Sequence, residues 1–112
     1  MNAFEIPAGY FTLNAKSDVD WHRFVKVGAT GEAEYATAGT DPIIGVSYGE
    51  AKATQPLSIV GRGIAMVEAS ATIAAGDFVN PSTDGKAAKS DAASFYVALT
   101  GGNAGDLITV KM

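Results

Sequence analysis

The side chains best suited to catalysis or metal binding lie close together near the start of the chain, where Asp18 and Asp20 precede His22, the only histidine. On a strand, Asp20 and His22 would share one face. A histidine oriented by a carboxylate is the arrangement of a general base or of a metal ligand. The same residues are also ordinary for a polar loop that leads into a strand, and the sequence favours this second interpretation.

Other chemical motifs in the sequence are incomplete. Asp18-x-Asp20 begins like a calcium loop, but the remaining oxygen ligands and the bidentate glutamate are missing. Gly61-Arg62-Gly63 lacks the third glycine and the helix of a dinucleotide-binding fingerprint, so it predicts a bend or bulge with Arg62 pointing outward. Asp84-Gly85-Lys86 resembles the hairpin tip of biotinyl and lipoyl carrier domains, but there the modified lysine is not preceded by glycine. We therefore expect no enzyme activity, no cofactor and no metal site.

The composition limits the classes of partner. The chain of 112 residues is 47% hydrophobic and 18% charged, with a formal net charge of −4 and no cysteine. This is enough apolar material for the core of one domain. The scattered cations form no basic stripe, which disfavours nucleic acid. No apolar stretch is long enough to span a membrane, and the absence of cysteine fits assembly in a reducing cytoplasm.

A near repeat is the main organisational feature of the chain. Phe24-Val25 aligns with Phe78-Val79, and Thr30-Gly31 aligns with Asp84-Gly85 in a position typical of a hairpin turn. Further apolar runs follow in the same order in each copy. The pattern predicts a duplicated unit of strand, tight turn, strand, loop, strand and strand, with copies at residues 24–60 and 78–110.

The predicted architecture is all-β: a small single-domain β-barrel or β-sandwich built from two similar halves, with at most one or two short helical turns. Residues 1–16 are expected to form an extended N-terminal arm, in which Tyr10–Asn14 pairs as a strand, and residues 17–112 the β domain. Leu57–Val60 and Gly63–Val67 are predicted as separate strands. The alanine-rich stretch Glu68–Ala75 is expected to make one or two helical turns that end at Gly76.

The aromatic and aliphatic side chains of the arm have two possible roles. They could close the bottom of the barrel, or they could lie on a neighbouring protein, where strand addition gives main-chain hydrogen bonds and side-chain pockets. The single tryptophan is expected to be a core or interface anchor. The candidate protein-interface residues are Phe4, Ile6, Tyr10, Phe11 and Trp21.

Several strings taken together resemble one family. The residues of 23–31 and 36–46, the stretch from Val67 to Val79, the turn at 84–87 and the closing residues 105–110 are similar to the tailed-phage capsid cement proteins, also called head decoration proteins. The resemblance extends from about residue 17 to the end. The aromatic arm, residues 1–16, departs from the family pattern.

The resemblance implies a compact β fold without enzymatic activity. It also implies a protein made in the host cytoplasm that binds the major capsid protein on the outer surface of the virion. Such proteins stabilise the mature head, often as homotrimers at threefold and local threefold sites. The alternative is a virion-surface or tail-associated β module that binds a host glycan or protein, for which an exposed aromatic cluster around Trp21 and Tyr48 would be the distinguishing feature. An enzyme built around His22 is the third possibility.

Overall fold

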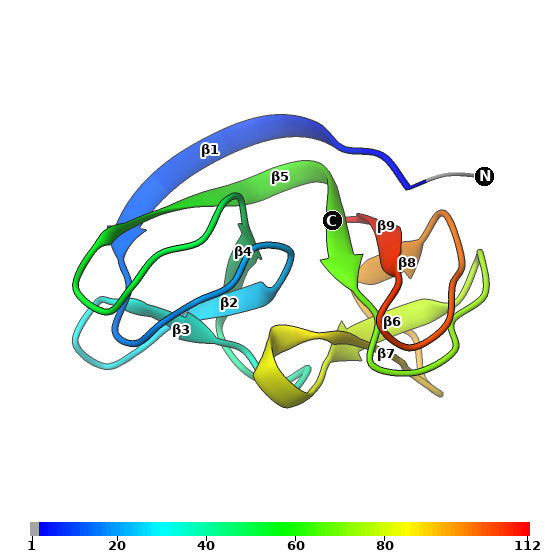
Figure 1. The fold of residues 1–112 in the computed structure, drawn as a ribbon. Coiled ribbons are helices and arrows are strands. Elements are labelled where there is room, and N and C mark those ends of the chain that lie inside the picture. The colour runs from blue at the N-terminus through cyan, green and yellow to red at the C-terminus, as the bar shows by residue number, and fades with distance from the viewer. Residues whose placement is uncertain (1–2) are drawn as a thin grey trace.

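Strands are the main regular elements of the computed structural model, which describes residues 3–112 (Figure 1). They form one nine-stranded antiparallel sheet in the order β3-β2-β4-β5-β9-β8-β6-β7, with β1 paired to β5. The predicted all-β single domain is therefore confirmed. The elements are β1 (Ile6–Asn14), β2 (Phe24–Val27), β3 (Ala33–Tyr35), β4 (Ile43–Ser47), β5 (Pro56–Glu68), β6 (Phe78–Pro81), the 3-10 turn η1 (Thr83–Gly85), β7 (Ala87–Lys89), β8 (Tyr96–Ala98) and β9 (Leu107–Lys111).

The strand order is that of two similar halves, as the sequence predicted. In the first half β2 pairs with β3 and β4, and β4 pairs with β5; in the second half β6 pairs with β7 and β8, and β8 pairs with β9. Individual hydrogen bonds repeat as well. The Ala36 N–H donates to the Phe24 carbonyl at 3.0 Å, and the Ser90 N–H donates to the Phe78 carbonyl at 2.8 Å.

Strand β1 also has a counterpart in the second half. Its register against β5 runs from Tyr10 opposite Val60 to Asn14 opposite Pro56. The register of β5 against β9 runs in the same way, from Ile64 opposite Lys111 to Glu68 opposite Leu107. In the repeat, residues 56–60 of β5 take the place in the first copy that β9 takes in the second. Residues 64–68 of β5 take the place in the second copy that β1 takes in the first. The structural repeat includes the strand part of the arm, and β5 belongs to both copies.

The two strands expected at 57–60 and 63–67 are one continuous strand, β5, so that expectation is wrong. The chain bends at Gly61–Gly63 without leaving the sheet, as Figure 1 shows at the turn of β5 away from β1. Gly63 has a φ of +101°, and a Cβ there would lie 2.6 Å from the carbonyl oxygen of Ile6. The glycine therefore lets β1 pass close to the bend, and the register of β1 shifts at Pro7 and Gly9. Arg62 is exposed, as expected.

Both tight hairpins form at the predicted glycines. In the first hairpin the Gly28 N–H donates to the Glu32 carbonyl at 2.9 Å, and Gly31 has a φ of +80°. In the second hairpin the Ser82 N–H donates to the Lys86 carbonyl at 2.7 Å, and Gly85 has a φ of +73°. Glycine supplies this left-handed conformation without a steric cost, which is why the two turns are recognisable in the sequence.

The helical turns expected at 68–75 are absent from the structure, and this prediction is wrong. Glu68 ends β5, Ala69 makes a bridge to Ala87, and Ile73 makes a bridge to Gly102. Alanine has a high intrinsic helix propensity, but the buried side chains of Ala69 and Ile73 are held by bridges to distant segments. Tertiary pairing outweighs the local preference.

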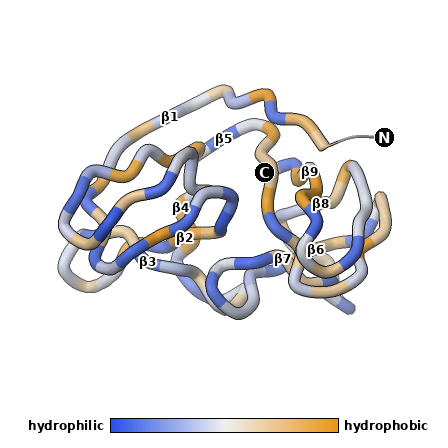
Figure 2. The backbone as a smooth tube through the Cα atoms, viewed as in Figure 1, coloured by the Kyte–Doolittle hydropathy of each residue, from blue (hydrophilic) through white to orange (hydrophobic). Residues whose placement is uncertain are grey.

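The core follows the duplication. Each half has its own buried cluster, and the cluster of the second half also takes in Phe24, Val46 and Val60 from the first half. The ring of Phe24 packs against the ring of Tyr96 from β8, with 5.1 Å between centroids. The two halves therefore share an apolar junction. Figure 2 shows hydrophobic stretches on the strands and hydrophilic or neutral ones in most connecting loops.

Candidate functional site

The candidate interface residues of the arm lie along β1 and just before it. Phe4 is partly buried and fastened to β9: its N–H donates to the Thr109 hydroxyl oxygen at 2.7 Å, and that hydroxyl donates to the Phe4 carbonyl at 3.1 Å. Ile6 and Tyr10 are 59% and 56% exposed, and Phe11 is 39% exposed. The arm is thus anchored at its beginning and presents large apolar side chains farther along.

Three exposed aromatic residues form a contiguous group, which we call the aromatic cluster: Tyr10, Trp21 and Tyr48. The ring of Tyr48 meets Tyr10 edge-on at 5.4 Å and meets Trp21 edge-on at 5.7 Å between centroids. Trp21 is 46% exposed and Tyr48 is 38% exposed. The tertiary structure therefore joins the arm, the loop before β2 and the end of β4. Edge-to-face pairs of this kind add stabilisation beyond the burial of their area.

Phe11 does not join the aromatic cluster. It covers the bend of β5, where a Cβ on Gly61 would lie 2.8 Å from Phe11 Cε1. Successive residues of a strand point to opposite faces, so Tyr10 and Phe11 serve different surfaces. A shallow hollow of about 280 Å³ lies where β1 passes the bend of β5, lined by Gly9, Tyr10, Phe11, Gly61 and Arg62.

A second hollow lies at the polar loop before the cluster. Its volume is about 170 Å³, and the carboxylates of Asp18, Asp20 and Glu50 line it together with Val19, Ala51, Lys52 and Gln55. Asp18 accepts a hydrogen bond from the Ala53 N–H at 2.9 Å and lies 3.7 Å from the Lys52 ammonium. Asp20 directly precedes Trp21, so this acidic hollow and the aromatic cluster are joined through the chain.

His22 is not arranged as a general base. Its Nδ1 lies 3.3 Å from the Met66 carbonyl oxygen and 3.8 Å from Glu5 Oε1, and its ring stacks on Trp21 with 4.7 Å between centroids. Burial lowers the pKa of His22 below its ordinary value, although the nearby Glu5 carboxylate opposes this shift. The predicted partners Asp18 and Asp20 bind other groups.

His22 also lies outside any strand, with a left-handed φ of +66°, so the expected shared face with Asp20 does not exist. The irregular segment at Trp21–His22 turns the histidine toward the end of β5 instead. Within residues 3–112 no group of three or more His, Asp or Glu side chains is placed to hold a metal ion.

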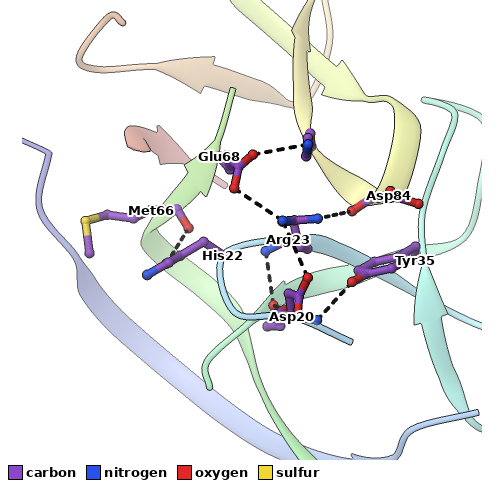
Figure 3. A network of polar contacts seen from close by, with 9 residues as sticks. Asp20, His22, Arg23, Tyr35, Met66, Glu68 and Asp84 are labelled. Carbon is purple, nitrogen blue, oxygen red and sulfur yellow. Dashed lines mark hydrogen bonds and ion pairs between the residues drawn. The ribbon is translucent and has the colours of Figure 1, made fainter. Parts of the chain in front are cut away.

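A buried cation links the two halves (Figure 3). Arg23 Nη2 lies 3.2 Å from Glu68 Oε1, and Arg23 Nη1 donates to the Asp84 carbonyl at 3.1 Å. Asp20 Oδ2 lies 3.7 Å from the same Nη2, and the Lys86 ammonium lies 3.2 Å from Glu68 Oε2. The Arg23 side chain is only 10% exposed.

Reasoning from the sequence overlooked this network. The available signal was a charged residue immediately before the buried pair Phe24-Val25, but the partners come from β5 and from the second hairpin, far along the chain. The arrangement holds four charged side chains of both signs in one place, and it is suited to fastening the halves together.

Another exposed aromatic residue lies in the loop before β8. Phe95 is 90% exposed, beside a hollow of about 360 Å³ that is lined by residues of 38–40, 80 and 93–96. The sequence did not single out Phe95, which lies just before the strand β8. Among the described residues no helix is long and apolar enough to cross a membrane.

The fold occurs in a known phage protein. The crystal structure of the N base of head fiber gp8.5 from bacteriophage phi29 is similar to this chain. The TM-score is 0.76 at 25% sequence identity, and the match covers 91% of each chain. Neither a family model nor a curated protein matches the sequence. The similarity therefore extends over nearly the whole chain, and it agrees with the sequence resemblance in pointing to proteins of the phage head.

Proposed function

We propose that this chain is a structural protein of a phage virion that binds the outside of the capsid and stabilises the mature head. The observation that carries the proposal is the similarity to the head fiber base over 91% of both chains. The sequence resemblance to capsid cement proteins, which rests on separate evidence, leads to the same class. In this proposal the chain is not an enzyme, and its partners are the major capsid protein and further copies of itself.

The surface of the protein is suited to this role. Large apolar side chains are exposed at Ile6, Tyr10, Trp21 and Phe95. Tyr10 and Trp21 are joined through Tyr48 into one exposed group, and such a group on a small domain is typical of a protein–protein contact. We propose that the predicted interface residues of the arm, together with Trp21, contact the capsid or neighbouring copies. The net charge of −4 would disfavour adhesion to DNA in the host.

A homotrimer at threefold and local threefold sites is the assembly that we propose. A trimer that meets three equivalent capsid sites makes the second and third contacts intramolecular, which raises avidity by about 10²–10⁴. A weak contact per copy is then sufficient for stable attachment.

Co-sedimentation of the purified protein with expanded, undecorated heads of its phage tests the proposal. Bound copies are counted by mass, and the thermal resistance of decorated and bare heads is compared. We expect saturation at three copies for each threefold and local threefold position, with a higher disruption temperature for decorated heads. No binding would refute attachment to the capsid, and binding without added heat resistance would refute stabilisation.

The aromatic cluster favours one alternative, a virion-surface or tail-associated module that binds a host glycan or protein. Exposed aromatic rings beside the acidic hollow offer stacking faces and hydrogen-bond acceptors, which are the features of a sugar site. A glycan array distinguishes the two functions. Specific hits that disappear in Trp21→Ala would support the module, and their absence would leave the capsid proposal alone.

A further inference from the structure

The duplication shows how one copy of the repeat covers the other. The second-copy strand, residues 64–68 of β5, pairs with β9 along one edge, and on its other edge only its first residue, Ile64, pairs with β1. Its other edge is covered by first-copy residues. The Glu68 N–H donates to the His22 carbonyl at 3.0 Å, and the Met66 carbonyl lies 3.3 Å from His22 Nδ1. The internal junction is thus a contact between a turn and a strand edge.

The corresponding edge in the first copy is open. When the register of β1 against β5 is compared with that of β5 against β9, Thr12 and Asn14 of β1 correspond to Met66 and Glu68. Alternate residues of an antiparallel strand direct their N–H and C=O groups to opposite sides, so these two residues direct theirs away from β5. In the part of the chain that the structure describes, β1 pairs only with β5, and both residues are exposed.

This edge lacks the usual protection against pairing. From Ala8 to Asn14 it carries neither a charged residue nor a proline, the two devices that commonly block the addition of a strand or turn. The short outer strands of the sheet, β3 and β7, each carry a charged residue. The open edge of β1 is therefore the more receptive one.

In the second copy, the turn at the position of His22 is Ala74–Gly76, and within the described chain this turn makes no equivalent contact with a strand edge. The His22 N–H donates to the Ser47 carbonyl at 3.4 Å, and the Gly76 N–H donates to the Ala98 carbonyl at 2.8 Å, at matching places in the repeat. Both residues are left-handed, with φ of +66° for His22 and +91° for Gly76. The turn Ala74–Gly76 is exposed, and among residues 3–112 no backbone or side-chain donor reaches the Gly76 carbonyl.

We propose that copies of this chain associate head to tail, with the turn Ala74–Gly76 of one copy on the open edge of β1 in the next. The Gly76 carbonyl accepts a hydrogen bond from the Asn14 N–H, as His22 accepts from Glu68 inside the chain. The small residues of the turn allow a close backbone approach. Because two different surfaces meet, the contact closes into a ring or continues as a filament. A ring of three would be the trimer of the proposed function.

A proline substitution tests the contact directly. Asn14→Pro removes the outward N–H while leaving the β5 side of the strand intact, since proline is tolerated at a sheet edge. Asn14→Ala, the matched control, keeps the N–H and makes a similar change to the side chain. We expect the natural protein and Asn14→Ala to form the same oligomer in sedimentation equilibrium. We expect Asn14→Pro to be monomeric, with a thermal unfolding transition that shows it is folded.

A cross-link provides a second test that does not depend on the proline variant folding. The chain has no cysteine, so Asn14→Cys combined with Gly76→Cys places one thiol on each side of the contact. Mild oxidation should yield disulfide-linked oligomers from the double variant, but no product larger than a dimer from either single variant. The non-glycine residue at the equivalent left-handed position, His22, shows that a side chain can be accommodated there.

A monomeric natural protein at all concentrations would overturn the proposal, as would equal association of the proline and alanine variants. The inference deepens the proposed trimer, but its failure is separable from failure of capsid binding. If monomeric Asn14→Pro still co-sediments with heads, the substitution has abolished self-association and the proposed capsid function stands. A natural oligomer that does not bind heads would support the contact and refute the capsid function.

Discussion

Glu68 Oε1 lies 3.2 Å from Arg23 Nη2, so that a carboxylate at the end of β5 is paired with the nearly buried guanidinium of the residue just before β2. The pair joins the last residue of the strand shared by both halves to the first hairpin of the fold. Through the Asp84 carbonyl the same guanidinium also reaches the second hairpin. One side chain therefore connects both copies of the repeat.

Glu68→Ala should destabilise the protein, because it leaves the Arg23 charge buried without its closest carboxylate. We expect a loss of about 2 kcal/mol in the free energy of unfolding, measured by chemical denaturation. The control is Lys16→Ala, which removes an exposed ion pair to Glu34 at 3.6 Å and should cost less than about 0.5 kcal/mol. Equal losses in the two variants would show that the Arg23 network does not fasten the halves.

The stability of the protein should fall as the pH drops below about 6.5. Burial lowers the pKa of His22 in the folded chain below the ordinary value of 6.5, so the unfolded chain takes up the proton first. The contribution of His22 is therefore constant above pH 6.5 and becomes unfavourable as the pH falls through that value toward the folded pKa. His22→Asn, which also tolerates a left-handed backbone, should flatten the unfolding free energy between pH 7 and pH 5. An unchanged slope would contradict this assignment.

Gly63→Ala should be more harmful than Gly31→Ala. Both glycines have positive φ, but a Cβ at Gly63 would lie 2.6 Å from the Ile6 carbonyl oxygen, whereas a Cβ at Gly31 meets nothing within 4 Å. Gly31→Ala adds only backbone strain, about 1 kcal/mol, and Gly63→Ala adds a clash that displaces β1 from the bend. Thermal unfolding measures both effects. Similar unfolding temperatures would show that the contact between β1 and the bend relaxes easily.

Trp21→Ala should weaken binding to expanded heads by more than tenfold, because a half-exposed tryptophan supported by Tyr48 has the properties of an interface hot spot. Because Trp21 also contacts Tyr48 and stacks on His22, binding is compared well below the unfolding temperature of the variant. Phe95→Ala is the matched control, since it removes an even more exposed ring from a different hollow. The opposite result, with loss of binding in Phe95→Ala alone, would place the capsid contact near β8.

Much of the fold was predictable because it depends on local chemistry. The left-handed glycines Gly31 and Gly85 and the matching pairs Phe24-Val25 and Phe78-Val79 identified the duplicated hairpins. The segment Glu68–Ala75 was mispredicted because alanine propensity indicates helix while the deciding contacts, such as the bridge from Ala69 to Ala87, lie elsewhere in the chain. The glycines around Gly63 predicted a bend, but the sequence did not show that β5 continues through this bend as one strand.

The candidate surfaces depended more on distant contacts. The all-β class, the two similar halves and the aromatic character of the arm follow from the residues alone, because side-chain alternation and turn residues act over short distances. The contact of Tyr10 with Tyr48, the burial of Arg23 beside Glu68 and the place of β1 as the first strand of the repeat become visible only in the folded chain. These relationships require strands that are far apart in the chain to pair in one register, and a register is chosen by the packing of the whole sheet rather than by any local segment.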